Sequence, residues 1–388
     1  MGETSEFDVV IVGSGLVGSS LCLSLGTLRV ALIEARPLTV NGPGEGDVRP
    51  LSLNYRSYRI LQELEVWDDV SQYGNPINTV HVSDKGYFGI TRICAEEYPV
   101  EALGYVVEVH RLAEVLLARV KQSNAHIFAP ATVQTVQPQG KGWQITLDCG
   151  GQEQQLTGKL LVAADGVNST LRQQLNLEVE IEDYQQTAVV TNVALARHHQ
   201  HVAYERFTPE GTVALLPLTG NRAGVVWSAP QEIATELLAL TGQQFQQRLQ
   251  KQFGYRAGRF LEVGSRHSYP LRGVFAKRQV ADNFILLGNS AHTLNPVAAQ
   301  GFNLGLADAA QLASCLLGNQ SQDFLAAYLK QRQPHQYQVR KLTENIIQWF
   351  GKKPWPMPLL RNLGLLGLSC SAWHRSQFAK LTMGISDD

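Results

Sequence analysis

Charged side chains are scarce in this sequence of 388 residues, since Asp, Glu, Lys and Arg together make up 17% of it. An average soluble protein has about 25%. The 33 basic and 34 acidic residues nearly cancel to a net charge of −1, so no excess of positive charge is present to attract nucleic acid, and we exclude that partner. The hydrophobic share of 44% instead suits a large buried core, a cofactor cavity or an apolar surface patch.

Long apolar runs and paired cysteines are also missing. No stretch of 18 apolar residues is present, so we expect no membrane-spanning helix. The first residues, MGETSEFDVVIVG, contain neither a basic region nor a cleavable apolar segment, and we expect no signal peptide. The five cysteines are far apart and form no CxxC pair. They favour reduced thiols over disulfides or a metal site, and hence a cytoplasmic protein.

Closely spaced glycines follow the first apolar segment. Phe7–Val12 (FDVVIV) is typical of a buried parallel strand and leads into Gly13, Gly15 and Gly18, spaced as GxGxxG before a stretch with helical spacing. Such glycines allow a tight turn, the approach of a pyrophosphate and close helix packing. A second apolar run ends at Glu34, 21 residues after Gly13, where a carboxylate accepts hydrogen bonds from a ribose. The pattern predicts dinucleotide binding; the alternative is a glycine-rich turn with a surface glutamate.

Two later segments have the same design of an apolar strand, a polar loop with glycine, and a helix. The run LLVAAD ends at Asp165 and Gly166, and Ser-x-x-Arg follows. The segment Ile285–Ala313 (ILLGNSAHTLNPVAAQGFNLGLADAAQLA) starts its helix near Gly301. Taken alone, the second segment is an ordinary loop. Its distance from the first predicts a nucleotide-binding part assembled from separated pieces of the chain, and a helix that starts after such a loop offers its N-terminus to an anion.

Together, these segments resemble the group A flavoprotein monooxygenases, the aromatic hydroxylases of the p-hydroxybenzoate hydroxylase type. Within that family, the sequence is most similar to the hydroxylases of bacterial ubiquinone biosynthesis, in particular the 2-octaprenyl-6-methoxyphenol hydroxylase subgroup. The stretches similar to this subgroup are Thr79–Gly86, Gly104–Leu112, Tyr204–Leu218 and Gln300–Asp308. The residues that match the family motifs are Gly13, Gly15, Gly18, Glu34, Ala164, Asp165, Gly166, Ser169, Arg172, Gly288, Ala291, His292, Pro296, Gln300, Gly301 and Asn303.

The resemblance implies a Rossmann-like domain that binds FAD and a cavity in which O2 and a phenol react. The first motif is expected to hold the ADP half of FAD, and the third its isoalloxazine ring. NADH or NADPH is the expected reductant, bound transiently because no second GxGxxG is present. The implied catalytic residues are Pro296, Gln300 and Gly301, and the implied cofactor-binding residues are Gly13, Gly15, Gly18, Glu34, Arg49, Arg111, Asp165, Gly166, Gly288, Asn289, Gly301 and Asn303.

The third motif departs from the family pattern at two positions. The family usually has Gly-Asp where this chain has Gly288 and Asn289, so an amide replaces a carboxylate expected to bond the ribityl chain. The family also commonly has glycine at the position of Ala299. Arg49 and Arg111 resemble family arginines near the flavin, although surface or packing roles compete. The sequence identifies no general base.

The length predicts about two domains, and the strand pattern predicts that they are interleaved. Between the second and third motifs, alternating strands such as HVAYERFT and TVALLPL are separated by turns, which indicates an antiparallel sheet. The expected fold class is α/β, with a Rossmann-like FAD-binding domain, an antiparallel-sheet substrate domain and a C-terminal helical tail. The expected boundaries are 1–70, 104–181 and 271–350 for the FAD-binding domain, 71–103 and 182–270 for the substrate domain, and 351–388 for the tail.

The tail combines basic and apolar residues. From Lys352 to Lys380 it contains five basic residues, no acidic residue, and Trp355 and Trp373 among many leucines. One interpretation is an interfacial helix that touches the inner membrane peripherally. The other is a helix that docks on the enzyme or on a sister subunit of a homo-oligomer. The leucines of the first interpretation lie at 359, 360, 363, 366 and 368.

We therefore expect an FAD-dependent monooxygenase that uses NAD(P)H and O2 to hydroxylate a polyprenyl phenol in ubiquinone biosynthesis. A first alternative is a hydroxylase of another ring position or of a small soluble phenol. A second is a flavin-dependent reductase or halogenase, although the WxWxIP motif of such halogenases is absent. A third is a non-catalytic flavin-binding scaffold of a ubiquinone-biosynthesis complex.

Overall fold

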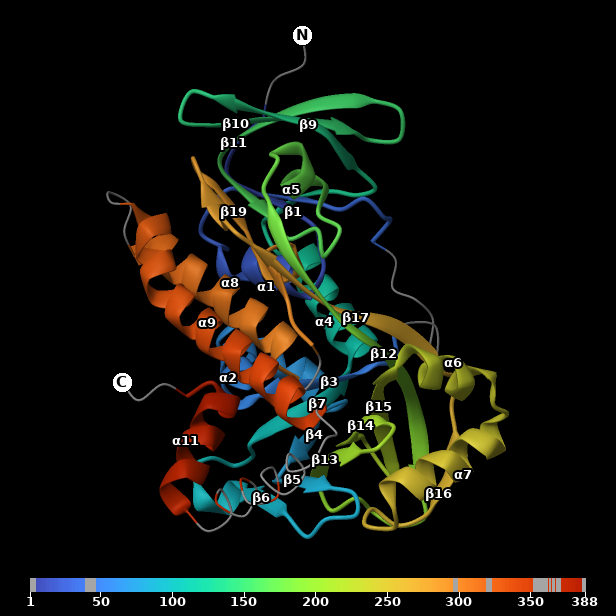
Figure 1. Cartoon of the computed structure of the whole chain (residues 1–388). Helices are drawn as coiled ribbons and strands as arrows, with labels where there is room; N and C mark the ends of the chain where they lie inside the picture. The colour runs from blue at the N-terminus through green and yellow to red at the C-terminus, as the bar shows by residue number, and fades with distance from the viewer. Residues whose placement is uncertain are drawn as a thin grey trace.

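The computed structural model describes residues 5–38, 47–295, 299–318, 323–351, 362, 364, 367 and 371–385. Two large sheets and one small sheet form the described part, and helices cover them (Figure 1). Within these ranges, no helix is both long enough and apolar enough to cross a membrane.

The first sheet has a parallel centre. Its parallel strands follow the order β19 (Phe284–Leu286), β11 (Glu153–Ala163), β1 (Ser5–Val12), β2 (Val30–Ile33) and β8 (His126–Phe128). Strands with antiparallel pairing extend it: β18 (Val280–Ala281) beside β19, and the hairpin of β9 (Thr132–Gln139) and β10 (Gly142–Asp148) beside β11. The parallel centre is the arrangement expected of a Rossmann-like domain.

Both faces of this sheet are buried, as expected when parallel strands are nearly all apolar. Side chains alternate between the faces of a strand, so Val9 and Ile11 of β1 point to one side, and Val10 and Val12 to the other. The first face packs against helices α1 (Leu16–Ser24), α4 (Val109–Gln122), α8 (Gln300–Gly318) and α9 (Phe324–Gly351). The second face packs against the β9–β10 hairpin and the short helix α5 (Thr170–Gln174).

The second large sheet comes from the middle of the chain. Its strands follow the order β20 (His292–Thr293), β17 (His267–Ala276), β12 (Val179–Leu195), β15 (Arg222–Pro230), β14 (Gly211–Pro217), β13 (Val202–Thr208), β5 (Thr79–Asp84) and β6 (Ile90–Cys94), with β16 (Phe260–Val263) beside β12. Helices α6 (Gln231–Ala239) and α7 (Gly242–Phe253) cover one face, where Trp227, Phe245 and Phe253 are fully buried. The opposite face lines a cavity.

One strand pair differs from the expected antiparallel pattern. β13 and β5 pair in parallel, with Glu205 opposite Val82, whereas the other pairs of this sheet are antiparallel. The two strands are far apart in the sequence, so no short hairpin forces the chain to reverse its direction between them. The predicted α/β class with an antiparallel-sheet substrate part is confirmed, with this one exception.

A small sheet joins the two large ones. It consists of β3 (Pro50–Asn54), β7 (Gly104–Glu108) and β4 (Asn75–Ile77), with helices α2 (Tyr55–Glu63) and α3 (Trp67–Ser71) packed beside it and the 3-10 turn η1 (Ala95–Glu97) following β6. A Cβ on Gly224 of β15 would lie only 2.4 Å from Cβ of Pro50 in β3. The small and the second large sheet therefore approach so closely that only glycine fits at this position.

The domain boundaries that we predicted fall inside continuous strands. The boundary at 181 lies within β12 (Val179–Leu195), and the boundary at 271 lies within β17 (His267–Ala276). Both strands belong to the second sheet, and Figure 1 shows the long β12 reaching from beside the first sheet into the second. We retain the division into two interleaved domains as a proposal.

The described part of the tail docks on the rest of the chain. Helix α11 (Ala372–Met383) buries Ala379 and Met383 against Ile77 of β4 and Leu103, and Arg375 Nε lies 3.0 Å from an oxygen of Glu97. Trp373 faces outward, with 67% of its surface exposed. The docking interpretation therefore describes α11. The predicted interfacial helix with its leucines at 359, 360, 363, 366 and 368 lies outside the described residues.

Candidate active site

The first glycine motif forms a tight turn between β1 and α1. Gly13 has φ +104°, and a Cβ there would lie 2.4 Å from the carbonyl oxygen of Ala164. A Cβ on Gly18 would lie 2.0 Å from the carbonyl oxygen of Gly13. Gly15, in contrast, has no atom within 4 Å of a Cβ position. Two of the glycines are thus required by packing, and the third faces open space in front of the N-terminus of α1, where a pyrophosphate fits.

Glu34 lies beside this turn at the end of β2. Its Oε2 accepts hydrogen bonds from the backbone N–H and the hydroxyl of Ser14, at 2.9 and 2.8 Å. Its Oε1 accepts a bond from the backbone N–H of Arg36 at 3.1 Å. The carboxylate is therefore held at the glycine turn, in the position expected of a ribose-binding acid.

Asp165 carries an unused buried oxygen. Its Oδ2 accepts hydrogen bonds from the backbone N–H groups of Thr170 and Leu171, at 2.8 and 3.3 Å. Its Oδ1 is buried, and no partner for it exists in the described part of the chain. The next residue, Gly166, has φ +88° and open space around it. Because a buried acceptor without a partner is costly, this oxygen fits a hydroxyl group of a ligand such as FAD.

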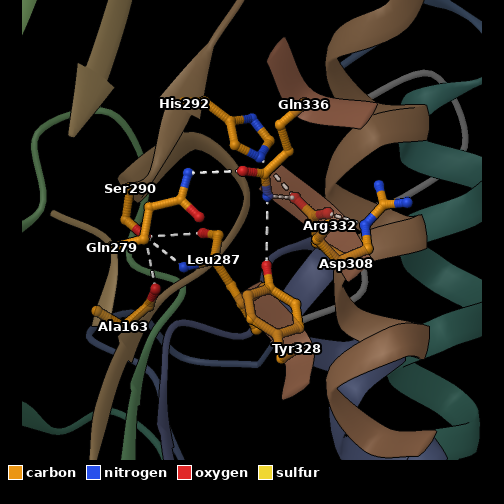
Figure 2. Close-up of polar contacts among 9 residues, drawn as sticks. All are labelled: Ala163, Gln279, Leu287, Ser290, His292, Asp308, Tyr328, Arg332 and Gln336. Carbon is orange, nitrogen blue, oxygen red and sulfur yellow. Dashed lines mark hydrogen bonds and ion pairs between the residues drawn. The ribbon is translucent and has the colours of Figure 1, made fainter. Parts of the chain in front are cut away.

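Arg172 connects the second motif with the third. It is buried, and it donates to the carbonyl oxygens of Ser290 at 2.9 Å and Val167 at 2.6 Å. The Ser290 hydroxyl in turn donates to the carbonyl oxygen of Ala163 at 2.5 Å (Figure 2). The resemblance included Arg172 among the family residues, but our list of site residues omitted both Arg172 and Ser290. The spacing of residues within either motif does not reveal that the side chain of Arg172 donates to the carbonyl oxygen of Ser290.

The third motif begins at the 3-10 turn η2 (Gly288–Ser290). Gly288 has φ +60°, and a Cβ there would approach the side chain of Val17 in α1 to 3.1 Å. The neighbouring Asn289, which replaces the family's aspartate, is exposed. Pro296, a predicted catalytic residue, lies outside the described residues. The motif thus packs Gly288 against the first motif, while Asn289 has its side chain at the surface.

The start of α8 closes one end of the cavity. Gln300 and Gly301 line this cavity, and a Cβ on Gly301 would meet no atom within 4 Å. Gln300 is buried and its Nε2 donates to the carbonyl oxygen of Thr382 in α11 at 3.4 Å. The side chain of Asn303 instead makes hydrogen bonds to other protein groups. Its amide nitrogen donates to the carbonyl oxygen of Ser52 at 2.9 Å, and its amide oxygen accepts a bond from the backbone N–H of Asn54 at 3.0 Å. We therefore propose that Asn303 positions α8 against β3.

The second departure from the family pattern has a conformational consequence. Ala299 has φ +51°, in the left-handed region where a Cβ is unfavourable and glycine is favoured. The family's glycine at this position is therefore explained by the backbone, at a residue that itself lines the cavity.

Ala299→Gly is expected to raise the free energy of unfolding by about 1 kcal/mol, because it removes the Cβ from a left-handed residue. Denaturant unfolding of the purified protein measures the change. Ala118→Gly, at an exposed position inside α4, is the matched control. It should lower the free energy of unfolding, since glycine inside a helix costs about 1 kcal/mol. A loss of stability in both variants would contradict the left-handed conformation of Ala299.

The two predicted arginines lie in different places. Arg49 lines the cavity, pairs with Asp47, and places its guanidinium 4.5 Å from the ring centre of Tyr269. Arg111 in the first turn of α4 contacts Glu114 at 3.2 Å and the ring of Tyr73 at 4.8 Å, and it is absent from the described cavity lining. The structure therefore brings Arg49 to the candidate site, whereas the described contacts of Arg111 are with surface neighbours.

A buried ionic cluster holds the third motif against two helices. Asp308 of α8 accepts bonds from Nε2 of His292 at 2.6 Å and from Nε of Arg332 in α9 at 2.5 Å (Figure 2). Gln336 donates to the same carboxylate at 2.9 Å and lies 3.4 Å from the hydroxyl of Tyr328. Burial opposes ionisation of Asp308, but the hydrogen bond from His292 and the charge of Arg332 outweigh it and lower the pKa of Asp308. Our sequence analysis missed this cluster.

The cavity that these elements enclose has a volume of about 940 Å³. Its walls are the inner face of the second sheet, the small sheet, the first turn of α8, and α11. Most of the lining side chains are apolar; those of the sheet face include Val80, Val82, Ala203, Phe207, Leu216 and Val226, and those of α11 include Phe378, Ala379 and Met383. Such a cavity holds an apolar ligand next to the motifs that fit FAD.

Comparisons with known proteins show the family to which this chain belongs. The chain matches a family model described as an FAD binding domain over residues 6–343. It is 32% identical over 387 residues to the ubiquinone hydroxylase UbiL of Rhodospirillum rubrum, covering 97% of this chain and 89% of that protein. It is 31% identical to the ubiquinone hydroxylase UbiM of Neisseria meningitidis, covering 92% and 80%. The solved structure of p-nitrophenol 4-monooxygenase PnpA from Pseudomonas putida is similar in fold, with a TM-score of 0.79, 16% identity, and 98% and 99% coverage.

The family model covers most of the chain, and two relatives exceed 30% identity over nearly its full length. Both findings confirm the predicted FAD-dependent enzyme class. This chain therefore belongs to the FAD binding domain family and is an FAD-dependent aromatic hydroxylase related to the ubiquinone hydroxylases.

Proposed function

We propose that this enzyme hydroxylates a ring carbon of a polyprenyl phenol in ubiquinone biosynthesis, and that this phenol is a 2-octaprenyl-6-methoxyphenol. The observation that carries the proposal is the apolar cavity of about 940 Å³ that reaches the first turn of α8. This volume is near the upper end of the range of about 300–1,000 Å³ for ligand pockets. The flavin ring would take part of this space at Gly301, and the apolar lining of the rest suits a ring with an apolar chain better than a small polar phenol.

The residues present fit FAD. We propose that the turn at Gly15 and the N-terminus of α1 receive its pyrophosphate, that Glu34 binds the adenosine ribose, and that Oδ1 of Asp165 accepts a bond from a hydroxyl group. The backbone N–H groups at Gly301 would face the ring end and stabilise negative charge there. FAD, when bound and reduced by a nicotinamide, supplies the activation of O2 for transfer of one oxygen atom to the ring.

The protein's own contribution is to orient the phenol and to exclude water. The apolar side chains of the second sheet and of α11 would surround the substrate, so few water molecules could compete for the activated oxygen. Gln300 connects α8 with the last turn of α11 through its bond to the Thr382 carbonyl. We propose that this contact keeps the cavity closed at the end where the ring would lie.

The remaining partners belong to the same proposal. NADH or NADPH would bind transiently, since the sequence has only one GxGxxG motif. The basic residues between Lys352 and Lys380 and the exposed Trp373 support peripheral contact of a cytoplasmic enzyme with the inner membrane, where a polyprenyl substrate is found. We include association with other ubiquinone-biosynthesis proteins and a homo-oligomer as further expectations.

Product analysis tests this function. We expect the FAD-loaded enzyme to add one oxygen atom from isotopically labelled O2 to a 2-octaprenyl-6-methoxyphenol dispersed in detergent, with NADPH or NADH as reductant. Mass spectrometry detects the label, and the fragments give the ring position. Accumulation in a deletion strain of an octaprenyl phenol lacking one hydroxyl group would support the same conclusion. Label only in a small soluble phenol, or nicotinamide oxidation without any labelled product, would contradict it.

A further inference from the structure

The apolar wall of the cavity contains one carboxylate. Along β13, side chains alternate between the two faces of the sheet, so Glu205 shares the cavity face with Ala203 and Phe207. Its neighbours across the sheet are Val82 of β5 and Ala214 of β14. All these neighbours line the same cavity and are apolar. A glutamate at this position therefore lies among hydrophobic side chains, where a charged group is rarely found without a partner.

No protein group described by the structure compensates this carboxylate. Glu205 makes no hydrogen bond or ion pair within the described ranges, and burial alone raises its pKa to about 7. The only other ionisable side chains among the described lining residues are Arg49, which pairs with Asp47, and Tyr204, whose ring packs against Phe253 of α7.

Two ionisable side chains beside Glu205 lie on the opposite face of the sheet, and Asp84 at the end of β5 is absent from the described cavity lining. Arg206 contacts Ser83 of β5 and the backbone of Gln252 in α7. His81 of β5 pairs with Tyr204 in the register of the strands and contacts Arg256. Strand alternation directs these side chains away from the cavity. β14 contributes no ionisable side chain, because its sequence is GTVALLP. Glu205 therefore faces the cavity as an isolated acid.

We propose that Glu205 is a catalytic base that accepts the proton of the substrate's phenolic hydroxyl, an inference that rests on the proposed function. In this step the phenol O–H bond breaks, the proton binds a carboxylate oxygen of Glu205, and the electron pair stays on the phenol oxygen. The phenolate donates electron density to the ring carbons ortho and para to it, which are the positions that an electrophilic oxygen attacks. The proton returns to solvent when the product leaves.

The chemistry of the cavity suits this role. An ordinary glutamate, with a pKa of about 4.3, is a weak base towards a phenol, whose pKa is about 10. The raised pKa of Glu205, about 7, reduces that difference and leaves the residue partly ionised near neutral pH, as general-base catalysis requires. A half-buried carboxylate without a partner among apolar side chains also destabilises the fold. A residue that costs stability in the substrate cavity is typical of a functional site.

The variant Glu205→Gln distinguishes a role of Glu205 as proton acceptor from a purely structural role. The glutamine amide has nearly the same shape as the carboxylate but takes up no proton. We expect the FAD-loaded variant to lose about 100-fold in the rate of ring hydroxylation. Wild-type hydroxylation should rise with pH through about 7, and the variant should lack this rise. Reduction of the flavin by NAD(P)H should be unchanged. Glu262→Gln, at an exposed position in β16, is the matched control and should behave as wild type.

Binding of p-nitrophenol to the FAD-loaded enzyme provides a second measurement that does not depend on turnover. Its phenolate absorbs visible light. If Glu205 shares a proton with the bound phenol, the two groups titrate as a coupled pair, so we expect two steps in the absorbance of wild type against pH and a single step in Glu205→Gln. If Glu205→Gln has the activity and the pH profile of wild type, and the bound ligand ionises in the same way in both proteins, the role of Glu205 is refuted. The proposed function would not be affected by that result. A wild-type enzyme that labels no polyprenyl phenol would instead contradict the proposed function, while the p-nitrophenol titration would still test the role of Glu205.

The fold of the variant is a separate control. The pKa of Glu205 is raised from 4.5 to about 7 in the folded protein, so the folded state binds more protons than the unfolded state between these values. Wild-type stability should therefore decrease as the pH rises through this window. Glu205→Gln should lack that decrease and should be at least as stable as wild type above pH 7. A large loss of stability in the variant would show a structural role and overturn the inference.

Discussion

Gly15→Val is expected to yield a folded, colourless protein that binds FAD at least about 100-fold more weakly than wild type. Gly15 has φ −61° and lies at the N-cap of α1, so any residue tolerates its backbone conformation. A Cβ there meets no protein atom within 4 Å. The branched side chain would instead fill the space in front of α1 where the pyrophosphate is proposed to lie. A 100-fold loss corresponds to about 2.7 kcal/mol of binding free energy.

Flavin absorbance of the purified variant and titration with FAD measure this effect, and thermal unfolding without FAD checks the fold. Gly242→Val is the matched control, because Gly242 begins helix α7 and likewise has open space around its Cβ position. That variant should remain yellow. A Gly15→Val protein with the FAD affinity of wild type would show that the first motif is only a glycine-rich turn, the alternative that the sequence left open.

The first motif could be predicted because its physical requirements are local. Gly18 is required by its contact with Gly13 in the same turn, Gly13 by its own φ of +104°, and Glu34 reaches that turn from the adjacent strand; only the contact of Gly13 with Ala164 comes from a distant segment. A spacing rule captures such contacts because the strand, turn and helix follow each other in the chain. The resemblance to the family pattern, not a spacing rule, marked Ala299 as a departure, and the structure supplies the reason in its positive φ.

Contacts between distant segments could not be predicted in this way. The bond from Arg172 to the Ser290 carbonyl joins residues that are 118 positions apart. The parallel pairing of β13 with β5, which places Glu205 beside Val82, depends on how two separate segments meet. A strand pattern reports which face a residue shares with its neighbours, but not what lies opposite that face. Glu205 could therefore be proposed as a base only once the cavity was known.

The position of α11 shows the same limit. Its sequence suits both an interfacial helix and a docked helix, because Ala379 and Met383 are as apolar as a membrane-facing residue would be. The contacts with Ile77 and Leu103, which identify α11 as a wall of the cavity, come from strands and loops nearly 300 residues earlier in the chain. Composition alone gives no preference between a lipid surface and a protein surface of equal hydrophobicity.

The second large effect is expected at the buried cluster around Asp308. Asp308→Ala should lower the free energy of unfolding by about 3–5 kcal/mol, because it leaves the Arg332 guanidinium buried without its carboxylate. The side chains of Asp308 and Arg332 are only 1% and 3% exposed, so water cannot replace the lost partner. Glu180→Ala, which breaks an exposed pair with Arg340, is the control and should cost less than about 1 kcal/mol. Denaturant unfolding measures both.

The same cluster should also make the free energy of unfolding depend on pH. The pKa of Asp308 is lowered from 3.8 in the folded protein, so the unfolded state binds more protons in acid. The stability that the cluster provides is therefore present above about pH 4 and is lost as the pH falls through the folded-state pKa. Asp308→Ala should lack this acid-sensitive component.

The cluster should also affect the flavin, because Asp308 holds His292, which lies in the third motif only four residues before the predicted catalytic residue Pro296. We expect Asp308→Ala to bind FAD more weakly even at temperatures where it remains folded. The double variant Asp308→Leu with Arg332→Leu removes both charges, so it should recover most of the stability. It should not recover FAD affinity, since His292 still lacks its partner. Recovery of both would show that Asp308 stabilises the helices without positioning the flavin loop.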